Sequence, residues 1–129
     1  MRGFLNQFGF TSDELNAFAN GDCGYLALAL NEITGWDVVI ITPIEAVATD
    51  FWYHMGVLMP DGRILDIKGA WDRDVFFDLW DSENYEVDIY DRDIEWATKS
   101  VQKRPPKYPD YDPSFYARQI LQKIELILS

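Results

Sequence analysis

The sequence is short of the residues that build disulfides and structural metal sites, because its 129 residues include one cysteine and one histidine. A single cysteine excludes a disulfide within the chain and fits a reducing compartment such as the cytoplasm. One cysteine and one histidine also argue against a structural zinc site, which needs four such ligands. We therefore expect a cytoplasmic protein without a bound metal or cofactor.

Basic residues are also scarce, with 11 Lys and Arg against 22 Asp and Glu and a net charge of −11. A chain this acidic lacks the basic face that direct binding to a nucleic-acid backbone needs. The charge permits a basic protein partner or mimicry of a polyanion, and it also simply favours solubility. The sequence shows no signal peptide and no apolar run long enough to span a membrane. Direct contact with nucleic acid or a membrane is therefore not expected, and the oligomeric state stays open.

The length predicts one domain over residues 1–129, and 48% apolar with 16% aromatic residues predicts a packed core. A capping box at Thr11–Glu14 opens the first expected helix. The expected elements are, in order, helices over 12–19 and 23–34, a strand over 38–41, hairpin strands over 51–59 and 63–68, a helix or aromatic-rich loop over 71–80, a strand over 85–90, a helix over 93–101, a proline-rich loop over 103–113 and a helix over 114–128.

The segment from Gly21 to Gly35 (GDCGYLALALNEITG) places the only cysteine at the expected start of a helix. Asp22 is expected to cap this helix with its side chain, and Gly35 to end it in the left-handed conformation. The positive field at a helix N-terminus favours the thiolate form of Cys23, whereas the neighbouring carboxylate of Asp22 opposes it. Cys23 therefore needs a cationic partner, and the sole histidine, His54, is the candidate.

His54 lies in a predicted β-hairpin whose register decides which acidic residue can reach it. The run from Met59 to Gly62 suits a three-residue loop, a type I turn followed by a left-handed glycine. With this loop His54 and Asp66 share one face, diagonal across neighbouring strands and roughly 7–8 Å apart between backbones. The other face is then almost purely apolar, whereas a two-residue loop would move Asp66 away from His54 and among apolar residues. Gly56, directly opposite Asp66, leaves room for their contact.

Cys23, His54 and Asp66 supply, in chain order, the nucleophile, the base and the orienting group that thiol catalysis requires. The oxyanion of such a reaction needs two hydrogen-bond donors, and the backbone amide of Cys23 is a natural one. Asn20 carries the nearest upstream side-chain amide, although an Asn-Gly pair is also a common turn. Two more distant alternatives are Gln7 and Asn16.

The runs GDCGYLALAL and YHMGVLMPDGRILDIKG resemble the papain-like and transglutaminase-like cysteine superfamily over residues 20–70. The resemblance implies an α+β fold in which a helix that begins at the catalytic cysteine packs on a small antiparallel sheet. It implies Cys23 as nucleophile, His54 as general base and then acid, and Asp66 as orienting residue. The Asn-Gly-Asp-Cys run also resembles ovarian-tumour-type deubiquitinases, but those place the histidine near the chain end. Papain-like proteases carry a glutamine a few residues before the cysteine, and none is in place here.

The expected function is a cysteine-dependent amide or isopeptide hydrolase, protease-like, that acts on a protein or peptide through a thioester acyl-enzyme. Transglutamination, deamidation and acyl transfer would use the same residues with another acceptor, and the sequence does not specify the substrate. Size and charge favour a compact intracellular effector, for example one from a phage or mobile element. The alternative is a non-catalytic acidic protein that blocks a basic partner. In that case Cys23 is a small buried hydrophobe and His54 a structural residue.

Overall fold

The structure, a computed structural model, describes residues 6–43, 54–80 and 87–128, which form an α+β fold with five helices and five strands. The strands form one antiparallel sheet in the order β4-β3-β2-β1-β5. They are β1 (Val38–Pro43), β2 (His54–Leu58), β3 (Ile64–Asp66), β4 (Gly69–Trp71) and β5 (Val87–Arg92). The helices are α1 (Ser12–Asn20), α2 (Cys23–Thr34), α3 (Arg73–Trp80), α4 (Ile94–Gln102) and α5 (Pro113–Leu128).

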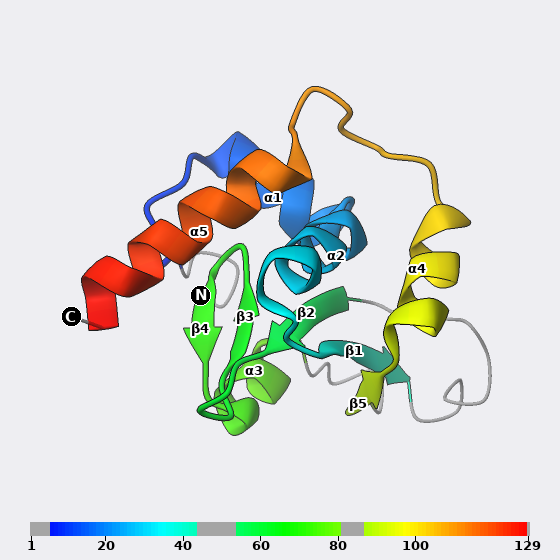
Figure 1. Ribbon diagram of the computed structural model, residues 1–129, viewed down its shortest axis with the longest axis horizontal. Helices are drawn as coiled ribbons and strands as arrows, with labels where there is room; N and C mark the ends of the chain where they lie inside the picture. Colours follow the sequence, from blue (N-terminus) through cyan, green and yellow to red (C-terminus); the bar gives the residue numbers. More distant parts are fainter. Residues whose placement is uncertain (1–5, 44–53, 81–86, 129) are drawn as a thin grey trace.

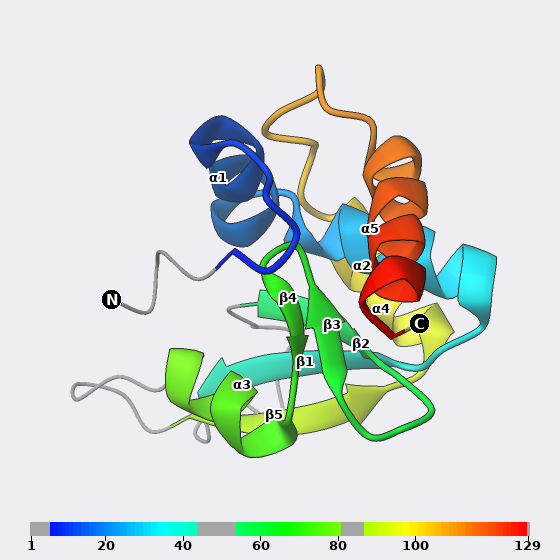
Figure 2. The same ribbon diagram turned by 90° about the vertical axis from the view of Figure 1, so that its left-hand side faces the viewer.

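Helices cover the two faces of this sheet unequally (Figures 1 and 2). Helices α1, α2, α4 and α5 lie on one face, where α2 packs against β2 and α5. Helix α3 lies on the other face, where Phe76 packs with Val39 and Ile41. Val38 and Ile40 point the opposite way, into the cluster around α2. Because β1 is covered on both faces, its described side chains are all apolar rather than alternating.

The sequence predicted the start of α1 and both ends of α2, but not the contacts of the Asp22 side chain. The Thr11 hydroxyl accepts from the Glu14 amide, and the Glu14 carboxylate accepts from the Thr11 amide, so the capping box is confirmed. Gly35 ends α2 at φ 76°, as expected. Asp22, however, makes no side-chain bond to the first turn of α2. Its backbone, at φ −101° and ψ 26°, lies outside the extended conformation that directs a capping side chain onto those amides.

The hairpin formed by β2 and β3 has the register that the three-residue loop predicted. The Met59 amide donates to the Arg63 carbonyl at 2.8 Å, so these two residues close the loop. Gly62 has φ 91°, in the left-handed region that glycine occupies without strain. Val57 pairs with Leu65, as the predicted register requires. As expected, one face of the hairpin is apolar, whereas His54 and Asp66 lie on the other face together with Leu58 and Ile64.

The structure also contains an edge strand that the sequence did not predict. Strand β4 pairs with β3 through Leu65 and Ala70, where we expected the hairpin to end at residues 68–69. Three residues that include a glycine carry no alternating pattern, so a strand this short leaves little signal. Residues 73–80 form helix α3, one of the two structures expected there. The parts of the expected elements that fall on 44–53 and 85–86 lie outside the described residues.

Candidate functional site

His54 stands at the start of β2, completely buried, with its ring beside Phe76 of α3. The two ring centroids are 5.9 Å apart. Ring atom Nε2 of His54 lies 3.0 Å from Oδ2 of Asp66, across the hairpin. The contact between the histidine and the aspartate, predicted from the hairpin register, is therefore confirmed.

Asp66 is held in place by the turn between β3 and β4. Its Oδ1 accepts from the amides of Lys68, at 2.9 Å, and of Gly69, at 3.2 Å. Its Oδ2 is the oxygen that faces His54. Because the two turn amides fix one oxygen, the other oxygen is aimed at the imidazole. The unpredicted strand β4 thus positions the carboxylate.

Gly56 is required where the sequence placed it, but mainly for a backbone reason. A Cβ at this position would lie 2.8 Å from the carbonyl oxygen of Leu65 and 3.2 Å from the Ile64 side chain. The close approach is between the two strands of the hairpin. The glycine therefore allows the strand pairing on which the contact between His54 and Asp66 depends.

Cys23 is the first residue of α2, and its side chain lies close enough to the His54 ring to shift the pKa of that ring. Since Nε2 of His54 faces Asp66, the ring nitrogen left for Cys23 is Nδ1. Burial by itself lowers the pKa of His54, but the interaction with Cys23 and the hydrogen bond to Asp66 together outweigh burial and raise this pKa to about 9. At neutral pH the ring is therefore an imidazolium between a carboxylate and the cysteine.

The three side-chain amides that the sequence offered as oxyanion donors are those of Asn20, Gln7 and Asn16. The side chain of Asn20, at the end of α1, lies outside the described part of the structure, so its role stays a prediction. Gln7 binds the edge strand instead: its Oε1 accepts from the Ala70 amide at 2.8 Å. Asn16 donates to the Tyr108 hydroxyl at 2.9 Å. The Cys23 amide, at the uncapped start of α2, remains a natural donor.

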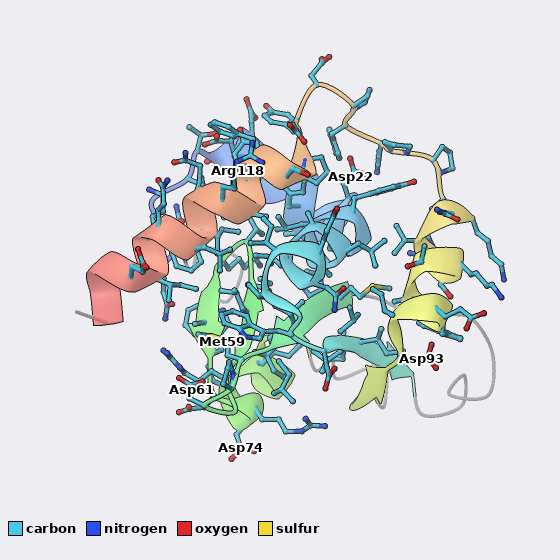
Figure 3. The ribbon with its side chains drawn as sticks, viewed as in Figure 1. Asp22, Met59, Asp61, Asp74, Asp93 and Arg118 are labelled. Atoms are coloured by element: carbon cyan, nitrogen blue, oxygen red, sulfur yellow. The ribbon has the colours of Figure 1, made fainter. Side chains whose placement is uncertain are left out.

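Asp22 binds a distant part of the chain that sequence reasoning did not connect to the site. Residues 103–112, which link α4 to α5 and which we call the proline-rich connection, pass over the start of α2 (Figures 1 and 3). The two oxygens of Asp22 accept from the amides of Lys107, at 2.8 Å, and Tyr108, at 2.9 Å. The Tyr25 hydroxyl donates to the Arg104 carbonyl. The first turn of α2 therefore holds this connection rather than being capped by its own aspartate.

Tyr108 of the proline-rich connection packs against Gly21, in the turn before α2. Its ring lies so close to Gly21 that a Cβ there would be 2.6 Å from a ring carbon. Its hydroxyl accepts from Asn16 of α1. Cys23, immediately after this covered turn, is only 4% exposed.

A pocket of about 310 Å³ lies between the first turn of α2 and the proline-rich connection. Aromatic rings, prolines and two carboxylates form its wall. The lining residues are Asp22, Tyr25, Pro106, Pro109, Tyr111, Asp112 and Pro113.

Two further findings complete the description of the site. Within the described ranges, no three His, Cys, Asp or Glu side chains come together as metal ligands would, and no helix is both long and apolar enough to cross a bilayer. Comparison of the chain with protein-family models, curated proteins and solved structures finds no match in any of the three.

Proposed function

We propose that the protein is a cysteine-dependent amide or isopeptide hydrolase with a papain-like arrangement of Cys23, His54 and Asp66. The observation that supports it most is the buried series of contacts from the Asp66 carboxylate through the His54 ring to the Cys23 side chain. A thiol nucleophile needs a base that holds it as thiolate, and the base needs a group that fixes its tautomer. The three residues fill these roles in one buried site.

In the acylation step the Cys23 thiolate attacks the carbonyl carbon of an amide, and a carbon–sulfur bond forms. The negative charge moves to the carbonyl oxygen, where the Cys23 amide at the start of α2 can donate a hydrogen bond. The His54 imidazolium then gives its Nδ1 proton to the leaving nitrogen as the carbon–nitrogen bond breaks. An amine leaves, and a thioester on Cys23 remains.

In the second step neutral His54 takes a proton from water, which attacks the thioester carbonyl. The carbon–sulfur bond breaks, a carboxylic acid leaves, and the thiolate and imidazolium are restored. Asp66 accepts from Nε2 throughout, so it keeps the Nδ1 atom facing Cys23 and stabilises the positive ring. If an amine replaces water in this step, the same residues perform acyl transfer.

A purely structural role explains the burial of this pair less well. Replacing a buried ion pair by well-packed apolar residues is often neutral or stabilising by about 1–4 kcal/mol, so such a pair is weak evidence for stability. Here both members are almost fully buried and next to a cysteine at a helix start. A buried group with a perturbed pKa, such as His54, beside a specific partner is typical of active sites.

The first test is alkylation of Cys23 with iodoacetamide, since the only cysteine makes the label unambiguous. We expect rapid labelling of the folded protein near neutral pH and a loss of about 100-fold in His54→Gln. Glutamine keeps a donor for Asp66, so this variant avoids leaving that carboxylate buried and unpaired. Slow labelling that is equal in both proteins would contradict the proposal.

The second test identifies the substrate. Protein extracts are treated with the wild-type protein or with Cys23→Ala, and cleaved, deamidated or cross-linked proteins are identified by mass spectrometry. Products that require Cys23 would support the enzyme and distinguish hydrolysis from acyl transfer. If no product depends on Cys23 in any of the extracts, the proposal that the protein hydrolyses other proteins is wrong.

A second proposal, from another class, is a non-catalytic binding protein that blocks a basic partner. The net charge of −11 is the observation that favours it. In that case binding should survive His54→Gln and Cys23→Ala unchanged, and Cys23 should react only on unfolding. The alkylation test therefore separates the two proposals before any partner is known.

A further inference from the structure

The pocket under the proline-rich connection begins one residue away from the proposed nucleophile. Asp22, which lines it, directly precedes Cys23, and neighbouring Cα atoms are about 3.8 Å apart. Tyr25, on the same side of the first turn of α2, continues the wall. A peptide whose carbonyl meets Cys23 would therefore bring a side chain next to the reacting bond within reach of this pocket.

The wall of the pocket carries the groups that recognise a cation. Asp22 and Asp112 provide carboxylates, and Tyr25 and Tyr111 provide aromatic rings, while no lysine or arginine is among the lining residues. Carboxylates form charge-assisted hydrogen bonds with ammonium and guanidinium groups, and aromatic faces attract the same groups. This composition favours a positively charged occupant over a neutral or acidic one.

The negative charge of Asp22 acts on a neighbouring group of the pocket wall, although both oxygens of Asp22 accept from backbone amides. Burial first, and then the charge of Asp22, raise the pKa of the neighbouring Tyr25 hydroxyl. Lys107 of the same connection does not line the pocket, and its ammonium lies over the Tyr108 ring, 5.8 Å from the centroid. The described basic groups of the connection therefore do not fill the pocket themselves.

The size of the pocket fits a single side chain. Its volume of about 310 Å³ is at the lower limit of the roughly 300–1,000 Å³ of small-molecule sites. The stem of a lysine or arginine can lie along the prolines of the pocket wall. The net charge of −11 adds a general attraction for basic substrates.

We propose that this pocket is a specificity subsite that takes the lysine or arginine side chain of a protein or peptide substrate beside the bond that Cys23 attacks. The proposal rests on the hydrolase function proposed above and names its substrate class. Asp112 and Tyr111 select the charge and shape of that side chain, and they take no part in the bond-breaking step.

The test uses short peptides that end in an acyloxymethyl ketone and modify the nucleophilic cysteine irreversibly. Two series vary the first and the second residue before the ketone, each with arginine, its uncharged isostere citrulline, or glutamate. We expect arginine to react about fivefold faster than citrulline in one series, and glutamate to react slowest. The preference for arginine should weaken as salt is raised.

Asp112→Asn should reduce the arginine-to-citrulline ratio to about one. Oδ1 of Asp112 accepts from the Ser114 amide at 3.0 Å, and asparagine can make the same bond, so α5 should keep its start. The matched control is Asp110→Asn, an exposed residue of the same connection that does not line the pocket. This control should keep the full preference for arginine.

Each outcome separates the two proposals. If iodoacetamide does not label folded Cys23 in a His54-dependent way, the hydrolase function itself is wrong. If iodoacetamide labels Cys23 in this way but the arginine and citrulline peptides react equally in both series, the hydrolase proposal is retained and the proposal of a basic subsite is wrong. An unchanged ratio in Asp112→Asn would also overturn the subsite, because the preference would then arise elsewhere.

Discussion

The two halves of the candidate site are held in place over very different distances along the chain. His54 and Asp66 are 12 positions apart and belong to neighbouring strands of one hairpin. The turn before Cys23 is held by Lys107 and Tyr108, which lie 85 and 86 positions from Asp22. The hairpin half can therefore form from local structure, whereas the cysteine half requires the C-terminal part of the chain to be folded.

Asp66 and Asp22, one in each half of the site, differ in how their carboxylate oxygens are used. Both accept from two backbone amides, but Asp66 uses a single oxygen for them and keeps the other for His54. Both oxygens of Asp22 accept hydrogen bonds from amides of the proline-rich connection. Asp66 can therefore orient the imidazole, while Asp22 anchors the proline-rich connection next to Cys23.

The largest expected effect is that of Asp66→Asn on the reactivity of Cys23. The amides of Lys68 and Gly69 require an oxygen acceptor, so the new side chain must turn its NH2 group toward His54. Nε2 would then have to accept, Nδ1 would carry the proton, and the neutral ring could no longer take one from Cys23. We expect alkylation at neutral pH, and turnover of any substrate, to fall by about 10²–10⁴-fold with the fold retained.

Asp22→Asn is the control for this change in the other half of the site. It alters the anchor of the proline-rich connection but not the contacts of His54, so the same rates should change by less than about tenfold. Equal losses in the two variants would mean that Asp66 acts through the fold rather than through the tautomer of His54.

A second comparison places one substitution, glycine to alanine, in each half. At Gly56 the added Cβ would lie 2.8 Å from a backbone oxygen, whereas at Gly21 its nearest neighbour is the Tyr108 side chain and the backbone oxygen of Ala17 is 3.3 Å away. We expect Gly56→Ala to lower the free energy of unfolding by about 2–3 kcal/mol and Gly21→Ala by about 1 kcal/mol. Denaturant unfolding measures both values, and a greater loss at Gly21 would reverse our ranking of the two halves.

The smallest expected effect is local. Asp22→Ala removes the acceptor of the Lys107 and Tyr108 amides, so hydrogen exchange at these two amides should accelerate by roughly tenfold. The amides of Lys68 and Gly69, which bind Asp66, provide the internal control and should exchange as before. If all four amides accelerate together, the two halves unfold as one unit and our separation of them fails.

The same contrast explains how much the sequence could predict. The pairing of His54 with Asp66 followed from the loop at residues 60–62, because loop length fixes the register and the register fixes the faces. The behaviour of Asp22 could not be predicted in this way, since it depends on backbone angles and on partners more than 80 positions away. The residue type alone suits a helix cap, as Asp93 shows at the start of α4.

Strand β4 and the pocket were missed for a related reason. Gly69–Trp71 is too short to show a strand pattern, yet its turn directs the oxygen of Asp66. The prolines of residues 103–113 predicted an irregular segment but gave no sign of what it covers. Local signals therefore located the candidate nucleophile, base and orienting residue, while their surroundings depend on tertiary contacts.

The most direct test of the central claim is an NMR titration of the His54 imidazole, the only one in the chain, in the wild-type protein and in Cys23→Ala. We expect a pKa of about 9 in the wild type, so that the ring is positive at neutral pH and its proton is lost only as the pH rises through that value. In Cys23→Ala the pKa should be lower, because the charge of Cys23 is the strongest influence that raises it. A wild-type pKa at or below the ordinary 6.5, or the same pKa in both proteins, would show that Cys23 and His54 do not form a reactive pair.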